Sequence, residues 1–318
     1  RMEADAVRLH SPHAHKPFII LKKFYKTNKT KKAMIKKLNT LLLITLALVN
    51  CSETPKQPNF VIIFTDDQRT NTLSCYDADC PIETPNIDRL ANEGMRFVNG
   101  YVTSPICGVS RACLLSGQYM SNHEVKRFQK PLPEESFAQS YPAKLKEAGY
   151  YLGHFGKHGF GITEEQIATY DDYDATTGQG PAFRVYKGDT LHDAAWLTQK
   201  THDFLEGVPE DQPFCVQLNY KEPHPSAVPA PEDLGKLADY PFERAITDTP
   251  EEFANLPEFV QTGYGRRSYN SILATDEKMQ TYLSHYYEKI MSVERSVGEI
   301  VKRLEEKVHE VRGKEEEN

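Results

Sequence analysis

A continuous apolar run near residue 60 constrains the fold of this chain more than any other stretch. The segment Asn59-Phe-Val-Ile-Ile-Phe-Thr-Asp66-Asp67 shows no alternation of apolar and polar residues. Such a run predicts a strand that is buried on both faces and central in a parallel sheet. Parallel sheets of this kind belong to α/β proteins, in which helices cover both faces. We therefore expect an α/β fold with a mostly parallel central sheet and helices on both faces.

Two adjacent carboxylates, Asp66 and Asp67, follow at the carboxyl end of this predicted strand. In open α/β sheets, ligands bind at that edge. Neighbouring acids repel each other unless a cation or solvent separates them. A hard divalent ion such as Ca²⁺ or Mg²⁺ prefers oxygen ligands. A turn with solvated acids explains the same dipeptide, so both interpretations stay open on these residues alone.

The segment Cys107-Gly-Val-Ser-Arg-Ala-Cys-Leu-Leu-Ser-Gly117 indicates chemistry on an anion. We predict a strand over residues 95–104 before it and a helix from Ser110 to about Tyr119 within it. A helix N-terminus favours anions, and Arg111 adds a fork of donors suited to an oxyanion. Cys107 is a potential nucleophile just outside the first turn. The alternative is a buried structural cysteine followed by an ordinary helix.

Composition limits the class of protein. The chain has 318 residues, 39% hydrophobic and 26% charged, with a net charge of −7. This charge argues against a general nucleic-acid binder, although a local basic pocket could still bind an anionic substrate. Six cysteines form neither a dense disulfide framework nor a zinc ribbon. Cys75 and Cys80 could pair or remain free thiols, whereas Cys107 and Cys113 lie on different turns of the predicted helix.

The N-terminal residues predict export. Residues 34–51 have a short basic start and an apolar core that is too short for a stable membrane anchor, which is typical of a secretory signal. Leu48-Val-Asn-Cys51 resembles a bacterial lipoprotein processing site. We expect Met34 to be the biological start, residues 1–33 an upstream extension, and residues 52–58 a tether. The protein would be periplasmic or anchored to the outer membrane of a bacterium, with a lipid as its only membrane contact. A buried helix of the fold is the alternative for residues 34–51.

Further polar residues follow predicted strands. Lys157 ends a strand over residues 150–157, and Lys221 and His224 end another over residues 213–224. Helices are predicted over residues 84–94, 141–149 and 282–306. Residues 160–195 and 226–275 are predicted to be long loops over the active-site edge. Within these loops, Arg184, Arg266 and Arg267 are either solvated or available to grip further anionic groups.

Three of these segments together resemble the type I sulfatases of the alkaline-phosphatase-like superfamily. They are Phe60 to Asp67, Thr84-Pro-Asn-Ile-Asp-Arg-Leu-Ala, and Cys107 to Gly117, and the resemblance runs from residue 58 to about 305. Cys107, Ser110, Arg111, Leu115 and Gly117 fit the family signature, while Val109 replaces its usual Pro or Ala. Many members have a His two residues after the lysine that matches Lys157. This chain has Gly159 there, with His158 as a secondary candidate.

The resemblance implies a set of roles. Cys107 would be converted to formylglycine by a formylglycine-generating or radical maturation enzyme. Asp66, Asp67 and the modified Cys107 would hold Ca²⁺, with Mg²⁺ as an alternative. Arg111, Lys157 and Lys221 would neutralise the sulfuryl oxygens, and His224 would protonate the leaving alcohol. Lys157, Lys221 and His224 would therefore also bind the substrate.

The implied activity is hydrolysis of sulfate esters on a sulfated carbohydrate, with no nucleic-acid partner. Two alternatives stay open: a phosphate or phosphonate monoester hydrolase of the same superfamily, and a non-catalytic binder of sulfated glycans. Residues 59–306 would form the N-terminal part of the catalytic domain and residues 307–318 a charged tail, with the C-terminal part of the fold missing. Since Ca²⁺ prefers six or more oxygen ligands, we expect low or absent activity from this chain by itself.

Overall fold

The computed structural model describes residues 57–317, with side chains described as far as residue 309. The predicted upstream extension, the signal segment 34–51 and most of the tether lie outside the described residues. Among the described residues, no helix combines the length and the apolar character that a bilayer span requires.

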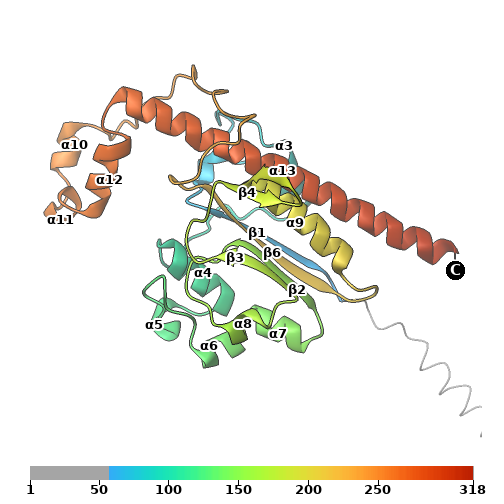
Figure 1. Ribbon diagram of the computed structural model, residues 1–318. Coiled ribbons are helices and arrows are strands. Elements are labelled where there is room, and N and C mark those ends of the chain that lie inside the picture. The colour runs from blue at the N-terminus through green and yellow to red at the C-terminus, as the bar shows by residue number, and fades with distance from the viewer. Residues whose placement is uncertain (1–56, 318) are drawn as a thin grey trace, which may run out of the picture. The chain divides into compact units, whose positions relative to one another are not determined.

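A four-stranded parallel sheet forms the centre of the fold (Figure 1). Its strand order is β1-β6-β2-β3, and each neighbouring pair is parallel. The four strands are β1 (Phe60–Asp66), β6 (Phe214–Pro223), β2 (Tyr151–Lys157) and β3 (Asp172–Thr176). A separate antiparallel hairpin consists of β4 (Phe183–Tyr186) and β5 (Asp189–His192). The α/β class with a mostly parallel central sheet is confirmed.

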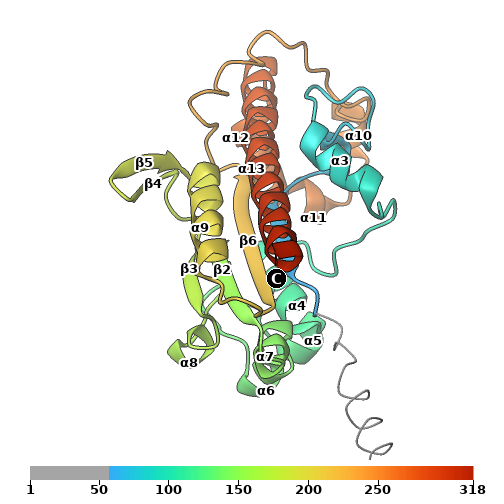
Figure 2. The ribbon, with the colours of Figure 1, turned by 90° about the vertical axis from the view of Figure 1, so that its right-hand side faces the viewer.

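Helices cover both faces of the sheet, as predicted (Figures 1 and 2). One face carries α9 (Asp193–Gly207) and α13 (Asp276–Glu317). The other face carries a group of shorter helices: α4 (Cys107–Ser116), α5 (Met120–His123), α6 (Glu134–Ala138), α7 (Tyr141–Glu147) and α8 (Glu164–Ile167). Near α13 lie α3 (Pro85–Glu93), the short 3-10 helix η2 (Thr70–Thr72) and the helices α10 (Pro250–Ala254), α11 (Glu258–Gln261) and α12 (Tyr264–Ile272).

The alternation of side chains along β6 explains why both faces are covered. Val216 and Leu218 are completely buried and pack in one cluster with residues of α9 and α13, such as Trp196 and Val293. Cys215 points to the opposite face and packs in a cluster with residues of β2 and α7. A strand with apolar residues on both faces can only be stable between two layers.

Two predictions about strands are wrong. The first strand, β1, is the edge strand of the four-stranded sheet, and most of its side chains are only half-buried, although its apolar run predicted a central position. Residues 95–104 form no strand; Phe97 and Tyr101 are 72% and 88% exposed. A strand needs a neighbouring strand for its backbone hydrogen bonds, and within residues 57–317 no strand pairs with this segment.

Several helix predictions hold with shifted limits. Helices α3 and α7 and strands β2 and β6 lie where the sequence predicted them. The helix α4 begins at Cys107 rather than Ser110 and ends at Ser116, followed by Gly117, which adopts the left-handed conformation with φ of 67°. The helix predicted over residues 282–306 spans Asp276–Glu317, so the predicted charged tail continues the helix. The predicted long loops contain α8, β3, β4, β5 and α10 to α12, and so are not structureless.

Leu218 provides a test of this packing. Leu218→Ala removes a completely buried side chain between β6 and the α9–α13 layer, and should lower the free energy of unfolding by about 2–5 kcal/mol. Urea unfolding followed by circular dichroism measures the loss. The matched control is Leu256→Ala, at a side chain that is 42% exposed, with an expected change within about 0.5 kcal/mol. Equal losses in the two variants would contradict the packing described here.

Candidate active site

A buried ion pair joins the carboxyl ends of β1 and β2. The Lys157 ammonium donates to the Asp66 carboxylate, and their side chains are only 3% and 4% exposed. The two strands are separated by β6, and all three run parallel, so their ends meet at one edge of the sheet. The register shift between Phe64 and Asp66 displaces the end of β1 relative to β6. The structure therefore brings together two of the residues predicted for the site.

Asp67 and His224 form a second, more exposed pair. Asp67 adopts a positive φ of 60°, and its carboxylate Oδ2 lies 3.7 Å from His224 Nε2. The backbone N–H of Ser226 donates to His224 Nδ1 at 3.2 Å, so the neutral ring carries its proton on Nε2. Burial lowers the pKa of His224, an effect that the nearby Asp66 carboxylate opposes. A neutral imidazole with its N–H facing Asp67 can donate a hydrogen bond at this edge.

Arg111 lies on α4 beneath this edge, with its guanidinium turned inward. The Nη1 group donates to the Lys157 carbonyl and to Asn219 Oδ1, both at 2.9 Å, and Nη2 donates to the Tyr220 carbonyl at 3.2 Å. The side chain is 3% exposed. The arginine thus ties the start of α4 to the ends of β2 and β6, and its charge acts on Asp66, Cys107 and Asp67.

The position of Gly159 explains how Arg111 fits. Gly159 has φ of +90°, and a Cβ atom at this position would lie 2.6 Å from Arg111 Cδ. A side chain at residue 159 would collide with the arginine as it stands here. A glycine at this position therefore leaves the path of Arg111 open.

Cys107 is the first residue of α4, one turn earlier than the sequence indicated. Its neighbour Gly108 packs so closely on residue 159 that a Cβ atom would lie 2.4 Å from the Gly159 carbonyl oxygen. Cys107 itself is half-buried. The first-turn backbone N–H groups of a helix are unpaired within the helix, so this position combines a reactive side chain with an anion-favouring helix end.

Lys221 and His158 point elsewhere. The Lys221 ammonium donates to the Pro181 carbonyl and lies 3.8 Å from Asp193 Oδ2, and none of its hydrogen bonds among the described residues goes to Asp66 or Asp67. His158 is buried; its Nδ1 lies 3.2 Å from Nε2 of His154, and burial lowers its pKa to about 3. The side chains of Lys221 and His158 are therefore engaged outside the Asp66–Asp67 group.

The three loop arginines are engaged in other contacts. Arg184 donates to Asp193 at 2.7 Å and stacks on Trp196 at 3.9 Å. Arg266 stacks on Phe253, and Arg267 lies 5.8 Å from the ring centre of Tyr264. Cys75 and Cys80 are free thiols.

Asn219 and Tyr286 are site residues that the sequence analysis missed. Asn219 accepts from Arg111, and the Tyr286 hydroxyl donates to the Asp67 carbonyl at 2.8 Å. The signal for Asn219 was present, because polar side chains alternate with apolar ones in Gln217-Leu-Asn219 within a buried strand. Tyr286 packs in an apolar cluster of α13, and its hydroxyl contact depends on tertiary structure.

The carboxylates of Asp66 and Asp67 are the type of ligand that a hard cation prefers. Asp66 and Asp67 provide carboxylate oxygens at one strand end, as Ca²⁺ or Mg²⁺ prefers. Among the described residues, no group of three or more His, Cys, Asp or Glu side chains is placed to hold a metal ion. A cation at this strand end would find carboxylate ligands in Asp66 and Asp67.

Glu222 is a buried carboxylate beside the site. It is completely buried, and neither of its carboxylate oxygens has a hydrogen-bond partner among the described residues. Burial, and next the charge of Asp193, raise its pKa to about 8, which Lys221 and Lys289 oppose. Glu222 is therefore a carboxylic acid in the folded protein near neutral pH.

Residues 58–310 match the family model described as Sulfatase. The match covers more than half of the chain and contains every candidate site residue named above, so the chain belongs to the sulfatase family.

Two curated relatives illustrate the similarity. The N-acetylglucosamine-6-O-sulfatase of Bacteroides thetaiotaomicron is 34% identical over 213 residues, which are 62% of this chain and 37% of that protein. The choline-sulfatase of Rhizobium meliloti is 25% identical over 291 residues, 79% of this chain and 54% of that protein. The chain thus spans about a third to a half of the length of these relatives.

Solved structures agree with the fold. A protein in complex with its substrate D-glucosamine-2-N,6-O-disulfate superposes with a TM-score of 0.61 at 25% identity, covering 79% of this chain and 63% of that chain. The phosphonate monoester hydrolase of Silicibacter pomeroyi superposes with a TM-score of 0.58 at 22% identity, covering 79% of this chain and 60% of its own. The second similarity concerns the fold alone.

Glu222 makes stability depend on pH. In the unfolded chain the carboxyl ionises near its ordinary pKa of 4.5, but in the folded chain it keeps its proton to about 8. A pKa that is raised in the folded state contributes stability that is fully present below the unfolded-state pKa. This contribution is lost as the pH rises through the folded-state pKa. Glu222→Gln lacks this loss, so its free energy of unfolding relative to wild type should rise between these two pH values.

Urea unfolding at several pH values in this window measures the difference. Glu243→Gln, at an exposed carboxylate, is the matched control and should follow wild type at each pH. A Glu222→Gln curve parallel to wild type across the window would show that Glu222 is ionised in the folded protein.

Proposed function

We propose that this chain forms the core of a sulfuric ester hydrolase that removes sulfate from a sulfated carbohydrate. One observation carries the proposal: Asp66, Asp67, Lys157 and His224 meet at the strand ends beside the N-terminus of the helix that begins with Cys107. The family match supports the reaction class. The relatives named as amino-sugar sulfatases support a carbohydrate as the substrate.

The chain's own residues would each meet a need of this reaction. Lys157 places a buried positive charge at this edge of the sheet. In a low-dielectric interior, such a charge can strongly stabilise the negative charge on the sulfuryl oxygens. His224 would protonate the leaving oxygen from its imidazolium form, which the Asp66 and Asp67 carboxylates favour, and would be left as the neutral imidazole. Arg111 fixes the start of α4, and its charge also acts on Asp66, Asp67 and Cys107. These residues therefore orient and neutralise the ester.

Two groups absent from the structure would complete the site. Asp66 and Asp67 would hold a divalent cation, Ca²⁺ or Mg²⁺, which neutralises developing negative charge when bound. Cys107, converted to formylglycine, would supply a hydrated aldehyde as nucleophile at the start of α4. A maturation enzyme would be the partner that converts Cys107.

A non-catalytic binder of sulfated glycans is a second candidate. It is favoured by the two-carboxylate donor set, which is smaller than the six or more oxygens that Ca²⁺ prefers. Lys157 and the exposed part of His224 could bind a sulfate group without chemistry. Both candidate functions predict binding of a sulfate group, but only the hydrolase predicts turnover of a sulfate ester.

Relative turnover of two aryl esters tests the proposal. The full chain should hydrolyse 4-nitrophenyl sulfate faster than 4-nitrophenyl phosphate, even if both are slow, because Asp66 balances the charge of Lys157 and the site therefore suits a monoanionic ester better than a dianionic one. Asp67→Ala should abolish the turnover, whereas Arg266→Ala, at an arginine engaged with Phe253, should retain it. A preference for the phosphate ester would indicate the phosphate or phosphonate hydrolase. Sulfate binding without any turnover would indicate the glycan binder.

A further inference from the structure

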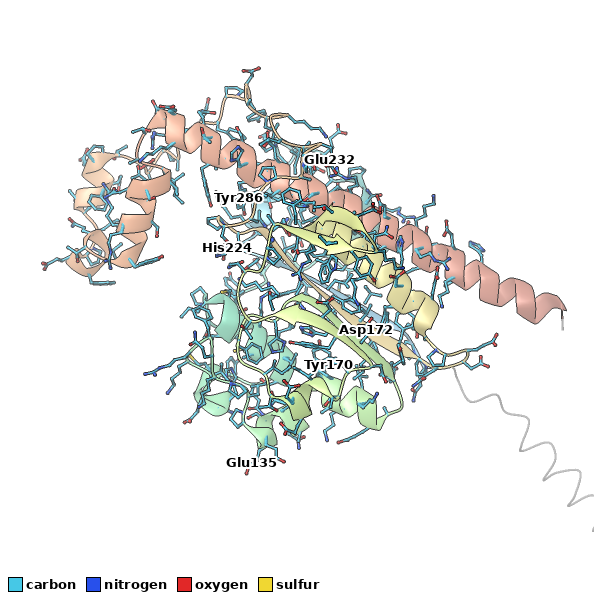
Figure 3. The ribbon with its side chains drawn as sticks, viewed as in Figure 1. Glu135, Tyr170, Asp172, His224, Glu232 and Tyr286 are labelled. Carbon is cyan, nitrogen blue, oxygen red and sulfur yellow. The ribbon has the colours of Figure 1, made fainter. Side chains whose placement is uncertain are left out.

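Helix α13 contacts both halves of the candidate site through two side chains. The Tyr286 hydroxyl donates to the Asp67 carbonyl at 2.8 Å and accepts the backbone N–H of Arg69 at 2.9 Å. Three residues further along the helix, Lys289 Nζ donates to the His224 carbonyl at 3.1 Å. Residues three apart lie on the same face of a helix. One face of α13 therefore holds the end of β1 and the turn that carries His224 (Figure 3).

The burial of Lys289 is informative. Its side chain is 2% exposed, and a lysine is seldom buried unless a partner compensates its lost hydration. The partner here is a backbone carbonyl, and the charge of Lys289 also acts on Glu222 and Asp67. Its position on the sheet-facing side of α13 thus serves the turn after β6 rather than the apolar core.

Hydrogen bonds within the turn close it, and one of them joins His224 Nδ1 and Ser226 Oγ at 2.9 Å. The His224 N–H donates to the Lys221 carbonyl at 2.9 Å, the Ala227 N–H donates to the His224 carbonyl at 2.9 Å, and the Ser226 N–H donates to His224 Nδ1. These bonds give the turn its shape but connect it only to itself. The bond from Lys289 to the His224 carbonyl connects the turn to another element of the fold.

The helix that carries these contacts is firmly packed. Ile290 is completely buried in a cluster with Phe242 and Met279, and Val293 and Val297 are buried against β6 and α9. A helix packed in this way cannot shift without disturbing a close-packed interior. The positions of Tyr286 and Lys289 relative to each other are therefore fixed.

We infer that Tyr286 and Lys289 are positioning residues that together set the placement of His224 relative to Asp67. The Asp67–His224 pair, with 3.7 Å between Oδ2 and Nε2, consists of a proposed cation ligand and a proposed proton donor on different segments. Displacing such groups by about 1 Å costs up to about a hundredfold in rate. This inference deepens the proposed function and rests on it for the catalytic consequence, although the anchoring itself does not.

Hydrogen–deuterium exchange of the full chain tests the anchoring without reference to activity. Tyr286→Phe should speed exchange of the Arg69 amide, and Lys289→Met should speed exchange in residues 221–227, each by roughly tenfold or more because local opening becomes easier. Tyr287→Phe and Lys302→Met are the matched controls. Tyr287 is a buried tyrosine of the same helix outside the two contacts with the site, and Lys302 is an exposed lysine of α13. Both should leave the two segments unchanged.

The catalytic consequence is read from aryl sulfate kinetics of the same variants. Lys289→Met and Tyr286→Phe should lower kcat by roughly tenfold with KM within about twofold, and Lys289→Arg should restore part of the loss. The double variant Glu222→Gln/Lys289→Met removes the buried ammonium together with the buried titratable carboxyl group, and keeps the test valid if Lys289→Met alone folds poorly.

The outcomes separate the two claims. Local changes in exchange in a chain that hydrolyses no sulfate ester would support the anchoring and refute the proposed hydrolase. Unchanged exchange in both segments would overturn the inference, whatever the activity. If Lys289→Met and the double variant both showed faster exchange throughout the chain, the inference would also be overturned, because that result indicates general destabilisation.

Discussion

The parallel alignment of β1, β6 and β2 is the constraint from which the site follows. Parallel strands end at the same edge of a sheet, so the strand alignment alone makes neighbours of residues more than 150 positions apart in the chain, such as Asp67 and His224. Asp66 follows β1's apolar run, Lys157 ends β2, and His224 comes directly after β6. The hydrophobic burial of the strands between two helix layers thus also positions the polar residues.

The polar groups at this edge are satisfied in a particular way. Asp66 and Lys157 neutralise each other, and Arg111 uses carbonyl and amide oxygens rather than carboxylates. A buried charge without a partner is costly, so each contact both relieves that cost and fixes a side chain. Glu222 is the exception, and its raised pKa is the physical response: it stays neutral instead of ionising. The edge is therefore preorganised around cationic groups and two acids.

The sequence revealed the parts of the site that depend on strand ends. Apolar runs located β1, β2 and β6, and the polar residues that follow these runs could be assigned to one edge of the sheet from the sequence alone. The position of β1 in the sheet could not be predicted this way, since a continuous apolar run does not say how many neighbours a strand has. For the same reason, the apolar residues 95–104 suggested a strand that has no partner among the described residues.

The directions in which side chains point could not be predicted from the sequence either. Lys221 shares a segment with His224, yet its ammonium turns to Pro181 and Asp193. Tyr286 fits the apolar periodicity of α13, and only the packing of that helix near the end of β1 reveals the use of its hydroxyl. Lys289 departs from the apolar pattern at a buried position, which is the kind of local inconsistency that marks a functional contact.

The central claim is that the start of α4 is a catalytic position and not a structural one. Mass spectrometry of the tryptic peptide that ends at Arg111 tests it most directly, on the full chain produced in a bacterial host that supplies a maturation enzyme. The account predicts the mass of formylglycine at Cys107, with Cys113 in the following peptide remaining a thiol. An unmodified thiol at Cys107 in all of the protein would contradict it.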